Sequence, residues 1–169
     1  YQEKKKLRNK EMKESLQYLG VKKFFRQNIP TRKLKENIGK TFNKINLLIK
    51  NWKIDTVFCP AYEGGHQDHD VSNFICSRLR NNYKVFEYAE YNFSKGKINC
   101  NEFVKPTKNE VTIKLSEREK REKMELLKIY NSEKGNLDYV KLDKECYRKL
   151  YDYDYSKPPH SGRLFYRRF

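Results

Sequence analysis

The stretch IDTVFCPAYEGGHQDHDVSNF, residues 54–74, decides the fold that we expect for this chain. It opens with IDTVF, a short run rich in β-forming residues, which is typical of a buried strand in an α/β unit. Two glycines and two histidines follow, and then Val71, Phe74 and Ile75 recur at helical spacing. The histidines therefore lie between the carboxyl end of a strand and the N-terminus of a helix, where ligands bind in open α/β sheets.

The segments on either side of this stretch alternate between helical and extended patterns. Two helices are predicted before it, one at residues 3–19 ending at Gly20 and an amphipathic one at residues 34–52. Two strands are predicted after it, at residues 84–91 and 109–115, and a capping box formed by Ser116 and Glu119 opens a helix that runs to about Tyr130. The pattern predicts an α/β fold, a Rossmann-like open sheet that is mostly parallel, with helices on both faces.

The length of 169 residues fits a single domain spanning residues 1–169. The net charge of +16 could mark a nucleic-acid partner, but the charge is spread along the chain and is mostly lysine, which favours a solvated surface. The four cysteines form no C-x-x-C pair, so we expect reduced thiols in a cytoplasmic protein. No apolar run approaches the roughly 18 residues that would span a bilayer.

His66, Asp68 and His69 form an H-x-D-H motif within the glycine loop. Imidazole is the commonest protein ligand of zinc, and hydrolytic zinc needs three protein ligands and an open position. His69 is the candidate ligand, and Asp68 could accept a hydrogen bond from an imidazole N–H and fix its tautomer. In the competing interpretation these side chains only cap the next helix, which one of them would suffice to do.

The same stretch resembles the second signature of the PIG-L/LmbE-type zinc-dependent N-deacetylases, in which a hydrophobic strand leads into H-x-D-H. Two further segments are similar to family motifs and occur in the family's order. RNKEMKESLQYLGV, residues 8–21, is similar to an R-x-x-E helix, and KMELLKIYNSEKGN, residues 123–136, is similar to a late helix of the family.

The resemblance implies metal-assisted removal of an acetyl group from an N-acetylated amino sugar or glycoconjugate. It implies that His69 is a ligand of Zn²⁺ and that His66 stabilises the oxyanion or protonates the leaving amine. It implies further that Asp68 orients His66 and that Arg8 helps to bind the substrate. Nucleic acid is not an expected partner, and nothing in the sequence indicates an oligomeric state.

The family's first signature, His-Pro-Asp-Asp-Glu, would supply the other two zinc ligands and the general base. No segment before Arg8 resembles it, and the remaining histidine, His160, lies in a proline-rich turn. We therefore expect a preceding segment that contains the first strand and helix and the remaining ligands. Two alternatives stay open: a degenerate, inactive homologue, and a non-catalytic basic module that binds nucleic acid or an anionic glycan.

Overall fold

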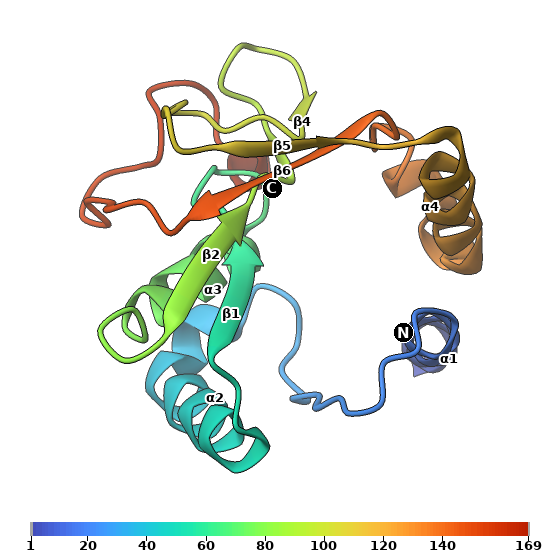
Figure 1. The fold of residues 1–169 in the computed structure, drawn as a ribbon, viewed down its shortest axis with the longest axis horizontal. Coiled ribbons are helices and arrows are strands. Elements are labelled where there is room, and N and C mark those ends of the chain that lie inside the picture. Colours follow the sequence, from blue (N-terminus) through green and yellow to red (C-terminus); the bar gives the residue numbers. More distant parts are fainter. Residues whose placement is uncertain (1, 169) are drawn as a thin grey trace. The chain divides into compact units, whose positions relative to one another are not determined.

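The computed structural model describes residues 2–168, which form two compact units (Figure 1). One unit holds residues 2–28 and 114–144, and the other holds residues 29–113 and 145–168. The helices are α1 (Gln2–Tyr18), η1 (Leu34–Asn37), α2 (Ile38–Trp52), α3 (Gln67–Ser77), α4 (Glu117–Ile129), η2 (Asn131–Asn136) and η3 (Phe165–Arg168). The strands are β1 (Thr56–Pro60), β2 (Lys84–Tyr88), β3 (Tyr91–Asn92), β4 (Asn99–Cys100), β5 (Val111–Lys114) and β6 (Lys144–Lys149).

The main sheet has four strands in the order β1-β2-β6-β5, and β3 pairs with β4 in a separate two-stranded sheet. β1 and β2 are parallel, joined through α3, as parallel pairing requires a crossover connection. β2 and β6 are antiparallel, and Figure 1 shows β5 and β6 running in opposite directions. The α/β class is confirmed, but the predicted mostly parallel sheet is not.

The reason for the difference is β6, a strand that the sequence pattern did not predict. Its sequence, KECYRK, has four charged residues, and only Cys146 and Tyr147 are not charged. The two inward positions are occupied by Cys146 and Arg148, both almost completely buried. A buried arginine is rare unless it is paired, so alternation of apolar and polar residues cannot reveal this strand.

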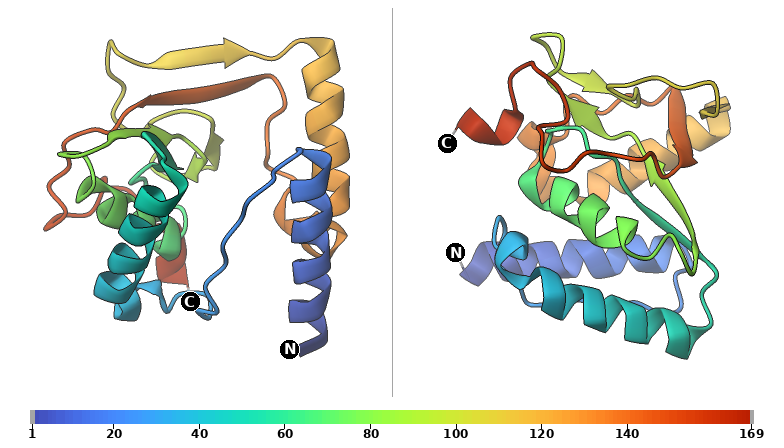
Figure 2. Two further views of the ribbon diagram at one scale, coloured as in Figure 1. Left: turned by 60° about the horizontal axis from the view of Figure 1, so that its bottom comes forward. Right: turned by 90° about the vertical axis from the view of Figure 1, so that its left-hand side faces the viewer.

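Helices α2 and α3 lie on the same side of the β1–β2 pair (Figures 1 and 2). The core between them is formed by Ile49 of α2, Cys76 of α3, Leu79 just after α3, and Cys59 and Val85 of the strands. The opposite face carries Phe58 stacked on Phe86, and Phe58 is 54% exposed. The expectation of helices on both faces is therefore not confirmed.

The unit formed by residues 2–28 and 114–144 contains α1, α4 and η2, which contact one another. The predicted capping box of α4 is confirmed, because Ser116 accepts from the Glu119 amide and the Glu119 side chain accepts from the Ser116 amide. Gly20 ends α1 with φ +66°, the left-handed conformation expected of a C-terminal cap. For these two helices, the capping residues in the sequence were therefore sufficient to predict where α4 begins and where α1 ends.

Candidate active site

The H-x-D-H loop connects the end of β1 to α3, as the sequence predicted. Ala61 directly follows β1. Its amide donates a hydrogen bond to the carbonyl of Tyr88, the last residue of the parallel neighbour β2. The loop then reaches Gln67, the first residue of α3. The histidines thus lie at the carboxyl edge of the parallel strand pair and at a helix N-terminus, which attracts negative charge.

Asp70, in the first turn of α3, holds this loop in shape. Its buried carboxylate accepts hydrogen bonds from the amides of Glu63 and Gly64, each at 3.1 Å, and from the Tyr166 hydroxyl at 2.9 Å. Burial raises the pKa of Asp70, and these donors oppose the rise. We did not single out Asp70 from the sequence.

His66 is the N-cap residue of α3. Its Nδ1 accepts a hydrogen bond from the Asp68 amide at 3.1 Å, and its backbone is extended, with φ −126° and ψ 137°. Because Nδ1 acts as an acceptor, the proton of the neutral ring is on Nε2, which remains available as a donor. Burial lowers the pKa of His66, and the neighbouring His69 adds to the effect. The His66 side chain can therefore cap α3 through Nδ1 and still donate a hydrogen bond through Nε2.

His69 lies beside His66, with ring centroids 5.0 Å apart. Its Nδ1 is 2.5 Å from Oε2 of Glu90, the second residue after β2. Both side chains are about one-third exposed. Sequence reasoning missed Glu90, although the carboxyl ends of neighbouring parallel strands meet at one edge, and this residue follows the strand next to β1.

Asp68 occupies a different place from the one expected for a partner of the His66 ring. Its Oδ2 accepts from the Arg32 amide at 2.7 Å, and its Oδ1 lies 3.4 Å from the Leu34 amide. The carboxylate therefore fastens the segment before α2 to the start of α3. It is the backbone N–H of Asp68, and not its carboxylate, that contacts His66.

Glu63 is buried within the loop, with 2% of its surface exposed. Its Oε1 accepts from the amides of Glu90 and Tyr91, at 2.8 and 2.9 Å. Its Oε2 makes no hydrogen bond within the described residues. Burial raises the pKa of Glu63 to about 8, and the nearby Glu90 charge contributes, against the hydrogen bonds from the two amides. Glu63 thus ties the histidine loop to the turn that carries Glu90.

Gly65 lies against the same turn so closely that a side chain cannot be added. A Cβ atom at this position would be 2.2 Å from the Tyr91 carbonyl oxygen. Gly65→Ala is therefore expected to lower the free energy of unfolding by about 1–3 kcal/mol or more, because the backbone around Tyr91 or Gly65 must shift to make room for the Cβ atom. The matched control is Gly39→Ala in α2, where nothing lies within 4 Å of the added Cβ. It should raise stability by about 0.5–1 kcal/mol. Urea unfolding followed by the fluorescence of Trp52 measures both, and equal effects would contradict the close contact.

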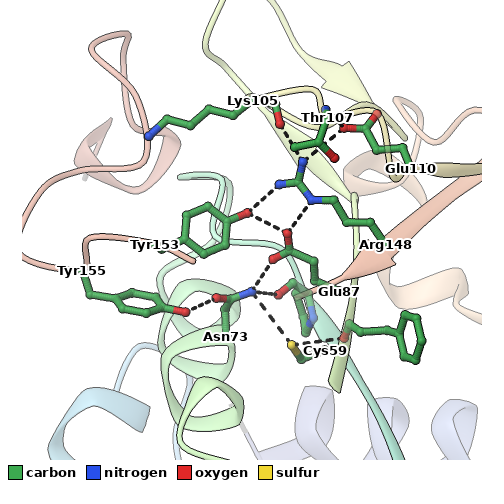
Figure 3. Close-up of polar contacts among 11 residues, drawn as sticks. Cys59, Asn73, Glu87, Lys105, Thr107, Glu110, Arg148, Tyr153 and Tyr155 are labelled. Atoms are coloured by element: carbon green, nitrogen blue, oxygen red, sulfur yellow. Dashed lines mark hydrogen bonds and ion pairs between the residues drawn. The ribbon is translucent and has the colours of Figure 1, made fainter. Parts of the chain in front are cut away.

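Next to the loop, a buried network of polar side chains joins α3, β2 and β6 (Figure 3). Glu87 Oε1 accepts from Arg148 Nε at 2.7 Å and from the Tyr153 hydroxyl at 2.9 Å. Glu87 Oε2 accepts from the side-chain Nδ2 of Asn73 at 2.9 Å. The side-chain Oδ1 of Asn73 in turn accepts from the Tyr155 hydroxyl at 2.6 Å. Both Glu87 oxygens are therefore bound, which indicates a structural network supporting the strand ends.

Arg8 lies in the other unit, where its guanidinium forms an ion pair with Glu133 at η2. One turn along α1, buried Glu11 accepts from the Ser132 amide at 2.8 Å and from its hydroxyl at 2.5 Å. The R-x-x-E pair thus joins α1 to η2. Substrate binding by Arg8 stays a prediction.

The described residues contain no complete metal site. His69, the predicted ligand, has its Nδ1 2.5 Å from Glu90 Oε2, an ion-pair contact in which this oxygen accepts no hydrogen bond from a described residue. No group of three histidine, cysteine, aspartate or glutamate side chains within residues 2–168 could hold a metal ion. Residues 2–168 thus do not fit a three-ligand zinc centre by themselves.

The described helices include none that is both long enough and apolar enough to cross a membrane.

Comparison with known proteins gives one match. The family model of PIG-L, described as GlcNAc-PI de-N-acetylase, matches residues 1–79, the part of the chain that extends from α1 to the end of the helix bearing the histidines. No curated protein and no solved structure matched. The family indicates a hydrolase of the deacetylase type. The resemblance noted in the sequence is thereby confirmed for residues 1–79, which match the PIG-L family model, while the segment at residues 123–136 lies outside this match.

Proposed function

We propose that the protein is a de-N-acetylase that hydrolyses the acetamide group of an N-acetylated amino sugar or glycoconjugate. The family match over residues 1–79 supports this reaction class. The observation that carries the proposal is the pair of adjacent imidazoles, His66 and His69, of which His66 accepts a hydrogen bond from the Asp68 amide at Nδ1. In the neutral His66 ring, Nε2 is therefore a donor.

The proposed role of His66 follows from its neutral state and its tautomer. In acetamide hydrolysis, water adds to the carbonyl carbon, negative charge develops on the carbonyl oxygen, and the C–N bond breaks as the amine gains a proton. The His66 Nε2–H can donate to the developing oxyanion and then supply a proton to the leaving amine. Burial keeps the pKa of His66 low, so the ring is a neutral donor near pH 7.

We propose Zn²⁺ as the cofactor, with His69 Nε2 as one ligand. Bound zinc would polarise the acetamide carbonyl and lower the pKa of bound water. The further ligands are expected outside the set of described side chains, as the family's first signature implies. We also propose a cytoplasmic location, which agrees with four buried cysteines that form no disulfide bond among the described residues.

The test uses His66→Asn in the full-length protein. Asparagine retains an acceptor at the N-cap of α3 but lacks the Nε2 donor. We expect kcat for release of free amine from substrates bearing N-acetylglucosamine to fall by about 100-fold or more, with little change in KM, because oxyanion donors contribute roughly 3 kcal/mol.

His66→Ala separates this role from capping. It should lose activity like His66→Asn and in addition lose about 1 kcal/mol of stability, because the cap acceptor is gone. An unchanged kcat in His66→Asn would overturn the role of His66. Absence of amine release by the wild-type protein with added zinc would overturn the proposed function.

A further inference from the structure

The C-terminal part of the chain returns to the histidine loop after β6. The Tyr62 hydroxyl donates to the Lys157 carbonyl at 2.8 Å, and the Phe165 amide donates to the Gly64 carbonyl at 2.9 Å. We call residues 157–166 the C-terminal strap. Because these two hydrogen bonds lie near opposite ends of the strap, both ends are tied to the loop between β1 and α3.

Between its ends, the strap packs directly on the loop backbone at Gly64. A Cβ atom at Gly64 would lie 2.6 Å from Leu164 Cδ2 and 3.0 Å from His160 Nε2. Leu164 is buried, with 5% of its surface exposed. Gly64 also has φ +73°, a left-handed conformation that favours glycine. The strap can therefore approach the loop this closely only because the residue at position 64 is glycine.

Tyr166, the last residue of the strap, is hydrogen bonded to Asp70, which directly follows His69 in the chain. The Tyr166 hydroxyl donates to Asp70 Oδ2 at 2.9 Å. Asp70 Oδ1 accepts from the amides of Glu63 and Gly64, each at 3.1 Å. The torsion that turns a carboxylate has only a broad intrinsic preference. A donor on one oxygen therefore fixes where the other oxygen lies, so Tyr166 sets the direction from which Asp70 holds the loop.

We propose that Tyr166 is a positioning residue of the active site, acting through Asp70 to fix the loop that carries His66 and His69. Asp70 is buried, with 6% of its surface exposed, so water has little access to take the place of the phenol. A displacement of about 1 Å can cost an enzyme about 100-fold in rate, so the loss of this hydrogen bond is expected to lower kcat. The proposal rests on the proposed function only for this effect on catalysis.

The first experiment measures the loop itself and needs no substrate. Tyr166→Phe removes only the hydroxyl, and hydrogen exchange of the Glu63 and Gly64 amides is followed by NMR in the full-length protein. We expect both amides to exchange about fivefold faster or more, the factor that corresponds to one typical hydrogen bond. The reason is that the Asp70 oxygen that accepts from them is no longer held in one direction.

Tyr155→Phe is the matched control, because the Tyr155 hydroxyl also donates to a side chain of α3, that of Asn73, at 2.6 Å. This variant should lower the urea midpoint of unfolding about as much as Tyr166→Phe does. It should nevertheless leave the exchange of the Glu63 and Gly64 amides at the wild-type rate. Unchanged exchange in Tyr166→Phe would overturn the proposal, as would equal acceleration in the two variants.

Activity gives the second readout. In Tyr166→Phe, kcat for amine release should fall about 10-fold or more with little change in KM, whereas Tyr155→Phe should keep the wild-type kcat. If Tyr166 acts through Asp70, Tyr166→Phe should have no further effect on kcat in an Asp70→Ala background. Multiplying losses in the double variant would overturn the route through Asp70.

Two results transfer the decision to the exchange rates. If Asp70→Ala does not fold, the comparison of Tyr166→Phe with Tyr155→Phe decides the role of Tyr166. If the wild-type protein releases no amine, the proposed function fails, and the exchange of the Glu63 and Gly64 amides still confirms or overturns the positioning of the loop by Tyr166.

Discussion

Replacing Arg148 by methionine is expected to lower the free energy of unfolding by about 3–5 kcal/mol, the typical cost of leaving one member of a buried ion pair without its partner. The side chains of Glu87 and Arg148 are 0% and 2% exposed. Methionine fills much of the space of the arginine stem but donates no hydrogen bond. Glu87 would then lie in the protein interior with only Asn73 and Tyr153 as hydrogen-bond donors.

The size of the effect follows from how many groups share the guanidinium. Besides Glu87, it donates to the Lys105 carbonyl at 2.6 Å and to Glu110 at 3.1 Å, and it lies over the Phe103 ring at 3.9 Å. All these contacts of the guanidinium are lost at once in Arg148→Met. Burial raises the pKa of Tyr153, so this phenol stays a donor and cannot neutralise the carboxylate.

A matched control separates burial from ion pairing. Arg80 and Asp152 are also 2.7 Å apart, but their side chains are 47% and 83% exposed. Arg80→Met should leave stability unchanged within error, because exposed pairs are screened by water. Urea unfolding monitored by Trp52 measures both variants.

The double variant Glu87→Gln/Arg148→Met should recover part of the stability lost in Arg148→Met, since the uncompensated charge is removed. Equal, small effects of Arg148→Met and Arg80→Met would contradict the structural role of the network.

Glu63→Gln is expected to make stability less dependent on pH. The pKa of Glu63 is raised from 4.5 to about 8, so the folded protein holds this proton where the unfolded chain has released it. Stability should therefore fall as the pH rises from about 4.5 to about 8 and then level off. Glutamine is neutral at every pH and keeps the oxygen that accepts from Glu90 and Tyr91, so the variant lacks this loss.

The measurement compares unfolding of the wild-type protein and Glu63→Gln at several pH values between about 4 and 9. The two should be similar at the acidic end, and the variant should be more stable by about 3–5 kcal/mol above pH 8, as the size of the pKa change implies. Glu36→Gln, which alters an exposed glutamate, is the control and should follow the wild-type curve. Parallel curves for the wild type and Glu63→Gln would show that this carboxyl ionises normally.

Local patterns in the sequence were enough to find the helices. Apolar spacing predicted α2 within residues 34–52, although its first turn is the 3₁₀ helix η1, and the capping box located the start of α4. Strand β1 was found with a shift of two residues at each end. These features depend on contacts within a few residues along the chain, so the sequence carries them directly.

The position of the site was also predictable, but the contacts that its side chains make were not. A strand followed by glycines and a helix is sufficient to place His66 and His69 at the carboxyl edge of the sheet. The motif suggested the Asp68 carboxylate as the partner of a histidine ring. In the structure, the backbone amide of Asp68 donates to His66, and His69 contacts Glu90 from another segment.

The sequence by itself determined the α/β class, the strand-loop-helix unit that presents the histidines, and the family resemblance over residues 1–79. Only the tertiary structure decided that β6 pairs antiparallel with β2, that Glu87 forms a buried pair with Arg148, and that Glu90 contacts His69. The physical reason is that each of these depends on a charged or polar group whose partner lies 21 to 61 residues away. Such a group carries no periodic signal and is buried only because the fold supplies its counterpart.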